Sequence, residues 1–411
     1  MLNENQDAHT GSTLGALLLI AGCCIGAGML GIPVVSATAG FIPSTLAMLL
    51  CYLFMTTTAF LLLEATLWFD RKVNVITIFG YALGTFGKIA TTVLFLFLFY
   101  CVLMAYTAGG GDLVSSFLET VLHRPIPTLI GSLICTFLVG IVIYVGARWV
   151  DRLNRVFMVG LILSYAILVL IGSFHVNFNV LLDSHWVAAV TTIPLMLISF
   201  GYHNLLPSLS NYLHRNVRQL RIAIIAGSLI PFVIYLIWQG VILGMLPQND
   251  DPLLQQAVSK SDMVTQLLAN TSGYPSVVLL ANYFAFFALA TSFISVALSV
   301  VDFLADGLNM HNPTKYTRIL LCGFVLLPPL FLALYNPHIF LKALGYAGGV
   351  ATVLLFGLLP ALVVWRGRYQ MQLDKPQLVP GGKPLLIVVI ALSITSLFLE
   401  LGQQFHWFSF S

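Results

Sequence analysis

Apolar stretches long enough to cross a bilayer recur along nearly the whole chain, separated by short segments rich in polar residues, proline or glycine. A membrane-spanning α-helix needs about 20 predominantly apolar residues. We expect eleven such helices, near residues 12–36, 42–68, 88–118, 127–146, 153–173, 187–212, 219–246, 276–305, 316–335, 338–365 and 384–402. The pattern predicts an all-α polytopic membrane protein with 11 transmembrane helices.

The composition fits a chain that is almost entirely embedded in a membrane. Of the 411 residues, 59% are hydrophobic and 8% are charged, whereas a soluble domain carries about 25% charged residues. Residues 1–411 are therefore expected to form a single transmembrane domain surrounded by the lipid bilayer. The net charge of +3 and the scattered basic residues argue against any surface for nucleic acid.

The connections between the predicted spans differ strongly in lysine and arginine content. Fifteen of these residues fall on one side of the membrane, and only Arg124, Lys260 and Lys342 fall on the other. Because basic connections are retained in the cytoplasm, the split places the N-terminus in the cytoplasm. An odd number of spans then places the C-terminus outside. The longest outside connection, 247–275, is expected to be either a cap over a pathway or a plain tether.

Helix-breaking residues interrupt the first and the sixth predicted spans. The first span contains a run of glycines and a proline, namely Gly22, Gly26, Gly28, Gly31 and Pro33. The sixth span combines glycine, polar residues and proline within residues 199–207. Since glycine and proline both destabilise a helix interior, we predict that both helices are broken.

The two interrupted spans open two halves with the same number of helices. Residues 12–173 and residues 187–365 each hold five predicted spans. An odd number of spans per half gives the second half the opposite topology, which is the pattern of an inverted repeat. The chain is thus expected to contain two inverted five-helix repeats, followed by an additional helix at 384–402.

A break inside the membrane frees backbone groups that cost several kcal/mol when they are buried without a partner. The N–H groups after the first break would form the positive end of a half-helix, which suits a carboxylate; they belong to Gly26, Ala27, Gly28 and Met29. Carbonyl groups that end the preceding half-helices would suit an ammonium group or a metal cation; they are those near Gly22, Cys23, Ser199 and Phe200. Together these groups would fit a zwitterion. The alternative is that the glycines only allow close helix packing.

Aromatic and polar side chains add further candidate ligands. His203 could relay a proton or bind a substituent on a substrate's ring, although it could instead bond an unwound carbonyl group. Tyr202, Phe200 and Tyr106 could form an aromatic pocket, although a place in the core or against lipid would explain each of them equally well.

Three carboxylates lie near the ends of predicted spans. Asp112 follows three glycines late in the third span and is expected near the external surface, where it could face a pathway. Glu64 and Asp302 fall near the cytoplasmic ends of their spans. There we expect them to reach the interface or to pair with one of the nearby cations, Arg71, Lys72 or Lys315.

Three segments resemble the bacterial hydroxy/aromatic amino acid permease family, which comprises tyrosine- and tryptophan-specific transporters. They are residues 21–33, residues 199–209, and the stretch 216–239 with its Asn216–Leu220, Gly227–Pro231 and Trp238–Gln239 pieces. The resemblance implies a leucine-transporter type fold in a bacterial inner membrane. It also implies import of an aromatic amino acid, tyrosine first among the candidates, together with a proton.

The broken helices and this resemblance together define the expected substrate-binding residues. They are Cys24, Gly26, Ala27, Gly28, Met29, Tyr106, Phe200, Gly201, Tyr202 and His203.

The eighth span resembles the Ala-x-x-Thr-Ser pattern with which sodium-coupled relatives of this fold bind sodium. The resemblance implies a coupling-ion site with five oxygen ligands, from Gly22, Ile25, Ala288, Thr291 and Ser292. Hydroxyl groups in apolar spans also bond to their own helix, and no lysine occupies the middle of the fifth span as a built-in cation. Sodium and proton coupling therefore both stay open, and no other metal site is expected.

These features favour a secondary transporter of a small-molecule amino acid over other classes of protein. A sodium-coupled or broader neutral amino acid transporter and a membrane amino acid sensor remain as alternatives. The sensor is disfavoured because the largest expected cytoplasmic loop covers only residues 366–383. The sequence has no HExxH motif, no paired midplane aspartates and no nucleophile with an obvious base, so neither an enzyme nor a cofactor is expected.

Overall fold

The computed structural model of the chain is helical in every regular element of the residues that it describes. These are residues 12–247, 263–271, 273–308, 310, 314–373 and 375–404, together with 252, 254, 255 and 258. Within them, ten helices are long and apolar enough to cross a membrane, and the bent pair at the start of the chain supplies an eleventh span if it is counted as one. The protein is therefore an all-α, multi-pass membrane protein, as the apolar stretches predict.

Most spans are single helices that agree with the predicted ranges. They are α3 (Phe41–Leu67), α4 (Val75–Leu122), α5 (Thr128–Val145), α6 (Ala147–Ser173), α9 (Val217–Gly244), α12 (Pro275–Gly307), α13 (Lys315–Tyr335) and α16 (Gly382–Gln404). Two shorter helices lie in connections: the 3₁₀-helix η1 (Val180–Leu182) follows α6, and α11 (Val264–Thr271) precedes α12.

The first span is divided into α1 (Thr13–Cys24) and α2 (Gly28–Ser36), which are bent by 55° relative to each other. Ile25 leaves the helix with an extended backbone, at φ −74° and ψ 97°. The break falls between Gly22 and Gly28, where glycine lowers the helix propensity of an otherwise apolar stretch.

The sixth span is interrupted as well. The 3₁₀-helix η2 (Ala188–Thr192) and α7 (Ile193–Ser199) precede the interruption, and η3 (His203–Leu205) and α8 (Leu206–Tyr212) follow it. Phe200 departs from α-helical geometry at φ −105° and ψ 24°. The two prolines near the break lie in the first turns of α7 and α8, where a missing N–H group disturbs the helix least.

The tenth span contains an unusual helix that the sequence does not reveal. It begins with α14 (Phe340–Gly345), continues as the π-helix η4 (Tyr346–Leu358) and ends with α15 (Leu359–Tyr369). π-Helical turns are rare and are often found at functional sites.

The third span begins earlier than its apolar pattern predicts. Helix α4 starts at Val75 rather than near residue 88, and Asn74 caps it by accepting a hydrogen bond from the backbone N–H of Thr77 at 2.8 Å. Gly84 interrupts α4 with a φ of +71°, a conformation that glycine adopts without steric cost. The residues before Gly84 thus form a separate helical arm.

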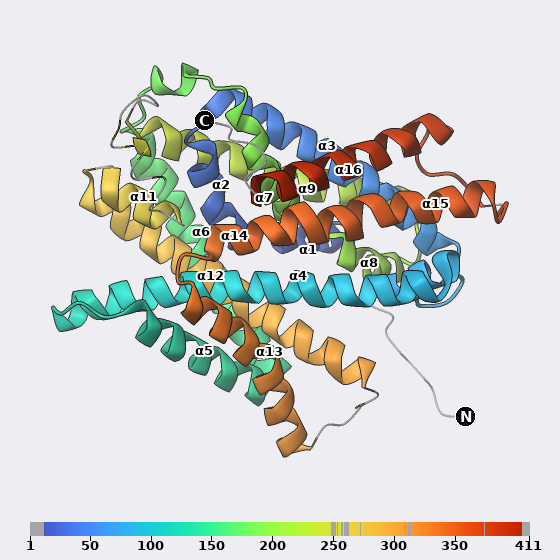
Figure 1. The fold of residues 1–411 in the computed structure, drawn as a ribbon, viewed down its shortest axis with the longest axis horizontal. Helices are drawn as coiled ribbons and strands as arrows, with labels where there is room; N and C mark the ends of the chain where they lie inside the picture. The colour runs from blue at the N-terminus through green and yellow to red at the C-terminus, as the bar shows by residue number, and fades with distance from the viewer. Residues whose placement is uncertain are drawn as a thin grey trace.

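One end of the helical bundle carries the arginine-rich connections. There α3 leads into α4, α5 into α6, α8 into α9, and α15 into α16; Figure 1 shows the α3–α4 and α15–α16 connections at the right of the view. We call this the basic end, after the cations on these connections, among them Arg71, Lys72, Arg148, Arg215 and Arg366. Inside the bundle, α1 packs on α9, α6 on α12, and α7 on η4.

Glu64 pairs with a cation that the sequence does not indicate. Its carboxylate accepts hydrogen bonds from Arg368 Nε at 2.7 Å and Nη2 at 2.6 Å, and from the backbone N–H of Leu378 at 2.7 Å. The Glu64 and Arg368 side chains are 2% and 4% exposed. The expectation of a partner among Arg71, Lys72 and Lys315 is therefore wrong, because the end of α15, distant in sequence, packs on the end of α3.

The connection between α9 and α12 contains a packed helix rather than only a tether. Helix α11 contacts α12 and α2, and Gln266 Nε2 donates a hydrogen bond to Asp112 Oδ2 of α4 at 3.0 Å. Much of 248–262 lies outside the described residues. Helix α11 covers the bundle at the end opposite the basic end.

Candidate functional site

A cavity of about 510 Å³ lies where the two broken spans face each other. Its wall includes residues from α1, α4, α6, α7, η3, α12 and η4. Backbone from both breaks borders the empty space, at Gly22, Gly26, Gly28 and Gly201. The cavity is therefore built around the two unwound segments.

Two glycines of the first break allow very close approach of neighbouring helices. A methyl group added at Gly26 would lie 2.6 Å from Ser292 Oγ of α12, and one added at Gly28 would lie 3.0 Å from Ser199 Oγ of α7. Ser292 Oγ also accepts a hydrogen bond from the backbone N–H of Ala27 at 3.3 Å. The start of α2 is thus held against α12 and α7. The N–H groups of Met29 and Leu30 donate to the carbonyl oxygens of Gly26 and Ala27, at 3.2 and 3.1 Å, so the N–H group of Met29 is not free to bind a carboxylate.

The other side of the break faces open space. A methyl group added at Gly22 would have no atom within 4 Å, and the neighbouring Cys23 is exposed although it lies within a membrane span. The Sγ atom of Cys23 lies 3.9 Å from the carbonyl oxygen of Gly201. Gly22 and Cys23 therefore present their surface to the cavity.

Tyr235 of α9 connects the two half-helices that end at the breaks. Its hydroxyl lies within hydrogen-bond distance of the carbonyl oxygen of Cys24, at the end of α1, and of Ser199, at the end of α7, at 3.1 Å for the latter. Tyr235 is fully buried. Its one hydrogen can be donated to either of these carbonyl groups, which the interrupted helices leave without a helical partner.

The structure brings most of the predicted site residues to the cavity. Those that line it are Gly22, Cys24, Ile25, Gly26, Gly28, Tyr106, Gly201, Thr291 and Ser292. The remaining predicted residues do not line it; they are Ala27, Met29, Phe200, Tyr202, His203 and Ala288.

His203 and Tyr202 are fully buried behind the cavity wall. His203 Nε2 lies 2.9 Å from Thr58 Oγ1 of α3, and its ring stacks on Phe356 of η4 with 4.8 Å between the ring centroids. His203 Nδ1 and Tyr202 Oη have no hydrogen-bond partner within the described part of the chain. Because Phe356 lines the cavity, His203 supports the wall from behind.

Met29 and Phe200 are likewise part of the packed core. The carbonyl oxygen of Met29 accepts a hydrogen bond from Trp238 Nε1 at 3.0 Å. The Phe200 ring packs on Tyr52 and Tyr235, with centroid distances of 5.9 and 5.5 Å. These contacts fix α2 and the second break against α3 and α9.

The two hydroxyls of the predicted coupling-ion site behave differently. Thr291 Oγ1 donates within its own helix, to the carbonyl oxygen of Phe287 at 2.9 Å or of Ala288 at 3.1 Å, which is the common arrangement in an apolar span. Ser292 instead contacts the first break. In the residues that the structure places, no group of three or more His, Cys, Asp or Glu side chains could hold a metal ion.

Four polar residues line the cavity that the sequence did not single out. They are Asn154, Asn204, Ser295 and Ser299. Asn154 Nδ2 of α6 donates to Ser295 Oγ of α12 at 2.6 Å. Ser292, Ser295 and Ser299 follow a helical spacing, which places them on one face of α12. This spacing is the signal in the sequence that could have revealed Ser295 and Ser299.

The cavity extends toward the basic end and is closed at the other. Leu18, Asn154 and Ser299 line it on the halves of α1, α6 and α12 nearer the basic end. In the opposite direction the helices are in tight contact. A methyl group added at Gly31 would lie 2.8 Å from side-chain atoms of both Leu195 and Leu341.

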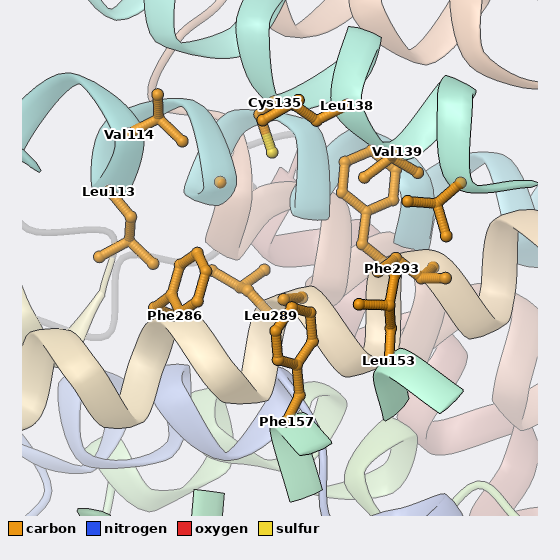
Figure 2. Close-up of a pocket in the computed structure, with 14 residues that line it drawn as sticks. Leu113, Val114, Cys135, Leu138, Val139, Leu153, Phe157, Phe286, Leu289 and Phe293 are labelled. Atoms are coloured by element: carbon orange, nitrogen blue, oxygen red, sulfur yellow. The ribbon is translucent and has the colours of Figure 1, made fainter. Parts of the chain in front are cut away.

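A second cavity, of about 150 Å³, lies between α4, α5, α6 and α12. Figure 2 shows the side chains that converge on it, among them Leu113, Cys135, Phe157, Phe286 and Leu289, and all of them are apolar or sulfur-containing. It offers no group that would bind the charged ends of an amino acid. The cavity at the breaks is therefore the candidate functional site.

A multi-pass membrane protein whose spans unwind around a cavity has a construction that is known from transporters. The family model described as the tryptophan/tyrosine permease family matches residues 9–399. The chain belongs to this family.

Relatives of known description agree with a transport function. The chain is 31% identical to the tyrosine-specific transport system 1 of Haemophilus influenzae over 93% of this chain and 94% of that protein. It is 31% identical to a tryptophan-specific transport protein of the same organism, over 97% of each. It is also 29% identical to glutamine transporter 2 of Aliivibrio fischeri, over 85% of this chain and 88% of that protein. All three are described as transport proteins, so the chain is a transporter rather than an enzyme.

Proposed function

We propose that the protein imports an aromatic L-amino acid, with tyrosine as the first candidate, by symport with a proton. The observation that carries the proposal is the cavity bordered by glycine backbone from both breaks. Unwound backbone of two spans at one cavity provides donors and acceptors that suit both ends of a zwitterion. The tyrosine- and tryptophan-specific relatives support an aromatic side chain.

In the proposed complex the substrate carboxylate lies at the start of α2, near the backbone N–H groups of Gly26 and Gly28. The positive end of the helix dipole stabilises an anion at this place. The ammonium group lies toward the carbonyl groups of the second break, near Gly201. The aromatic ring lies among the cavity-lining rings of Phe95, Phe99 and Tyr106.

The proposal includes a leucine-transporter type architecture. Residues 12–173 and 187–365 form the two inverted halves, and residues 384–402 form the additional helix. The basic end then faces the cytoplasm of a bacterial cell, by the positive-inside rule, with the N-terminus inside and the C-terminus outside. In this orientation the cavity faces inward.

Proton coupling is preferred to sodium coupling on the contacts of Ser292. Its Oγ atom accepts the N–H group of Ala27 at 3.3 Å, so this hydroxyl joins α12 to the first break by a direct hydrogen bond, without an ion between them. Sodium-coupled transport is the alternative to be tested beside it.

The glutamine-transporting relative supports a second candidate substrate class. A neutral amino acid with an amide side chain could meet the polar wall formed by Asn154, Ser295 and Ser299. This candidate keeps the same backbone site for the carboxylate and ammonium groups. It differs only in the side chain that the cavity accepts.

Transport assays in liposomes test the proposal. The purified full chain is reconstituted, and uptake of labelled tyrosine is measured under an imposed inward proton gradient, an inward sodium gradient, or neither. We expect the proton gradient alone to drive accumulation, with competition by tryptophan and weaker competition by glutamine. Stimulation by sodium alone would favour the alternative ion, and stronger competition by glutamine the alternative substrate. Absence of stimulation by either gradient would remove symport.

A further inference from the structure

Helix α16 carries a carboxyl group buried inside an apolar span. Glu400 is 1% exposed and lies one turn before the end of α16, away from the basic end. Carboxyl groups within membrane spans are rare and usually functional. Glu400 lies outside the cavity wall and takes no part in the candidate substrate site.

The Glu400 carboxyl has little compensation for a negative charge. Its one hydrogen bond within the described residues is from Gln404 Nε2 to Oε1, at 2.8 Å, one helical turn away on α16. No salt bridge reaches it there. Burying an ionised carboxylate beside a single neutral donor is costly, and a bound proton removes that cost.

Among the described residues, the elements that contact α16 place no cation beside Glu400. On η4 the facing titratable residue is Tyr346, which interacts electrostatically with Glu400. Helices η2 and α7, which also contact α16, contain no titratable residue. On α14, Lys342 is exposed. The cations of α15 lie at the basic end, where Arg368 is bound to Glu64, and Lys383 lies at the far end of α16.

Glu400 lies directly on the π-helix η4 and on the residue before it. A methyl group added at Gly349 would lie 2.5 Å from Glu400 Cγ, and one added at Gly345 would lie 3.2 Å from its Oε1. On a neighbouring face η4 presses on α7, since a methyl group added at Gly348 would lie 1.8 Å from the carbonyl oxygen of Pro194. The π-helix is thus in tight contact both with the Glu400 side chain and with the half-helix that ends at the second break.

The same segment also borders the substrate cavity. Leu344, one residue before Gly345, lines it, and so does Phe356 of η4. A change in the packing of η4 on α16 would therefore move part of the cavity wall together with α7. Glu400 is linked to the substrate site through one continuous helix.

We propose that Glu400 binds the coupling proton, and that its proton occupancy sets the packing of η4 between α16 and the second break. The neutral carboxyl fits the tight contact with Gly345 and Gly349. When the proton leaves, the ionised carboxylate favours separation of η4 from α16 and access of water. This inference rests on the proposed proton symport and names the group that binds the proton.

Comparing Glu400→Gln with the wild type tests the proposal, because the amide keeps the shape and the bond to Gln404 but cannot exchange a proton. Two assays with labelled tyrosine are run in liposomes: accumulation driven by an inward proton gradient, and exchange with unlabelled tyrosine without a gradient. We expect the variant to retain exchange within about twofold and to lose gradient-driven accumulation by about tenfold or more. Glu119 is an exposed carboxylate near the end of α4, on the side of the bundle away from the basic end. The variant Glu119→Gln therefore serves as the control and should behave as wild type.

Three results would be decisive against the proposal. Undiminished gradient-driven accumulation in Glu400→Gln overturns it, because transport would then be coupled elsewhere. Loss of exchange together with accumulation also overturns it, because Glu400 would then be needed only for the folded structure. A wild type that exchanges tyrosine but ignores the proton gradient refutes the proposed proton symport itself, and this failure is seen in the wild type alone.

Discussion

At the scale of single residues, the site depends on positions where a side chain is excluded. Gly26 and Gly22 lie four residues apart on either side of the point where α1 ends. A methyl group added at Gly26 would lie 2.6 Å from Ser292 Oγ, whereas one added at Gly22 would have no atom within 4 Å. The two glycines are therefore alike in sequence but opposite in their surroundings, and each can serve as the control for the other.

Gly26→Ala is expected to reduce uptake by about tenfold or more, because small displacements of binding groups have large effects on rate. The added methyl group would push Ser292 aside and break its bond to the Ala27 N–H group. Gly22→Ala should lose less uptake than Gly26→Ala, since its methyl group enters the cavity without displacing a neighbouring side chain. Initial rates of labelled tyrosine uptake, normalised to the amount of folded protein, measure both. Equal loss in the two variants would show that the glycines matter for helix flexibility rather than for close approach.

Some residues that line the cavity can be predicted from the sequence and others cannot. Glycine in an apolar span is itself a signal of a break, so Gly26, Gly28 and Gly201 are predictable. The direction of a side chain beside a break depends on backbone angles that the sequence does not give, so His203 and Tyr202 were predicted at the site but lie behind its wall. The place of Asn154 in the cavity wall could not be predicted, because a single amide beside a basic connection is typical of the membrane–water interface.

At the scale of elements, the ends of interrupted helices must be satisfied by other helices. The hydroxyl of Tyr235 in α9 lies within hydrogen-bond distance of a carbonyl group at each break, that of Cys24 and that of Ser199, and can donate its one hydrogen to either. It thereby fixes the distance between α1 and α7 at the cavity. Tyr165 of α6 makes a comparable bond, to the carbonyl oxygen of Ile234 at 3.0 Å, but touches neither break.

Tyr235→Phe is expected to lower stability by about 1–3 kcal/mol, because it leaves buried acceptors without a donor. Uptake should fall as well, since the two half-helices lose their common anchor. Tyr165→Phe should cost similar stability but leave the affinity for tyrosine close to wild type. Thermal unfolding in detergent and the KM for uptake separate the two effects. A normal KM in Tyr235→Phe would mean that α1 and α7 hold their positions without this hydroxyl.

The buried pair of Glu64 and Arg368 holds the connection between α15 and α16 at the basic end. Arg368 Nη2 also donates to the carbonyl oxygen of Val379, and Arg221 of α9 donates to that of Leu378, both at 3.2 Å. The connection between α15 and α16 is thus docked on α3 and α9. The pair could not be predicted from local sequence, because its members are 304 residues apart.

Glu64→Gln is expected to destabilise the fold by about 3–5 kcal/mol, because it leaves the Arg368 charge buried without its partner. The double variant Glu64→Leu, Arg368→Leu should recover much of this loss, because neither charge remains. Asp151→Asn, which breaks the exposed pair with Arg155, should change stability by less than about 1 kcal/mol. Thermal unfolding of the purified protein ranks the variants. A double variant as unstable as the single one would show that the hydrogen bonds, and not charge pairing, hold the connection.

At the scale of the whole molecule, the approximate places of the spans follow from hydrophobicity alone, because each span must supply its own run of apolar residues. Features that depend on packing between spans did not follow. The π-helix η4 and the helical arm before Gly84 are examples, since neither interrupts the apolar pattern. The sequence also carries no sign of which end of the cavity is open, because this depends on the relative positions of whole helices.

The open end of the cavity can be tested with a native thiol. Cys23 is exposed in the middle of the first span, whereas Cys24, Cys51 and Cys101 are buried. If the basic end faces the cytoplasm, a membrane-impermeant maleimide should label Cys23 in inside-out vesicles and not in right-side-out vesicles. Tyrosine should slow the labelling, because Cys23 borders the proposed substrate site.

Cys23→Ser is the control for this experiment and should abolish the labelling while uptake continues. Protection by tyrosine requires that the substrate occupies the cavity beside the first break, so labelling without protection would place the substrate elsewhere. Labelling from the outer surface alone would contradict the proposed orientation or the closed contact at Gly31.

The contact at Gly31 can be tested at the same cysteine. In a Gly31→Leu variant, the larger side chain should push α2 away from Leu195 and Leu341. Because alternating access exposes one site to each side in turn, Cys23 in this variant should be labelled from the outside as well as from the inside.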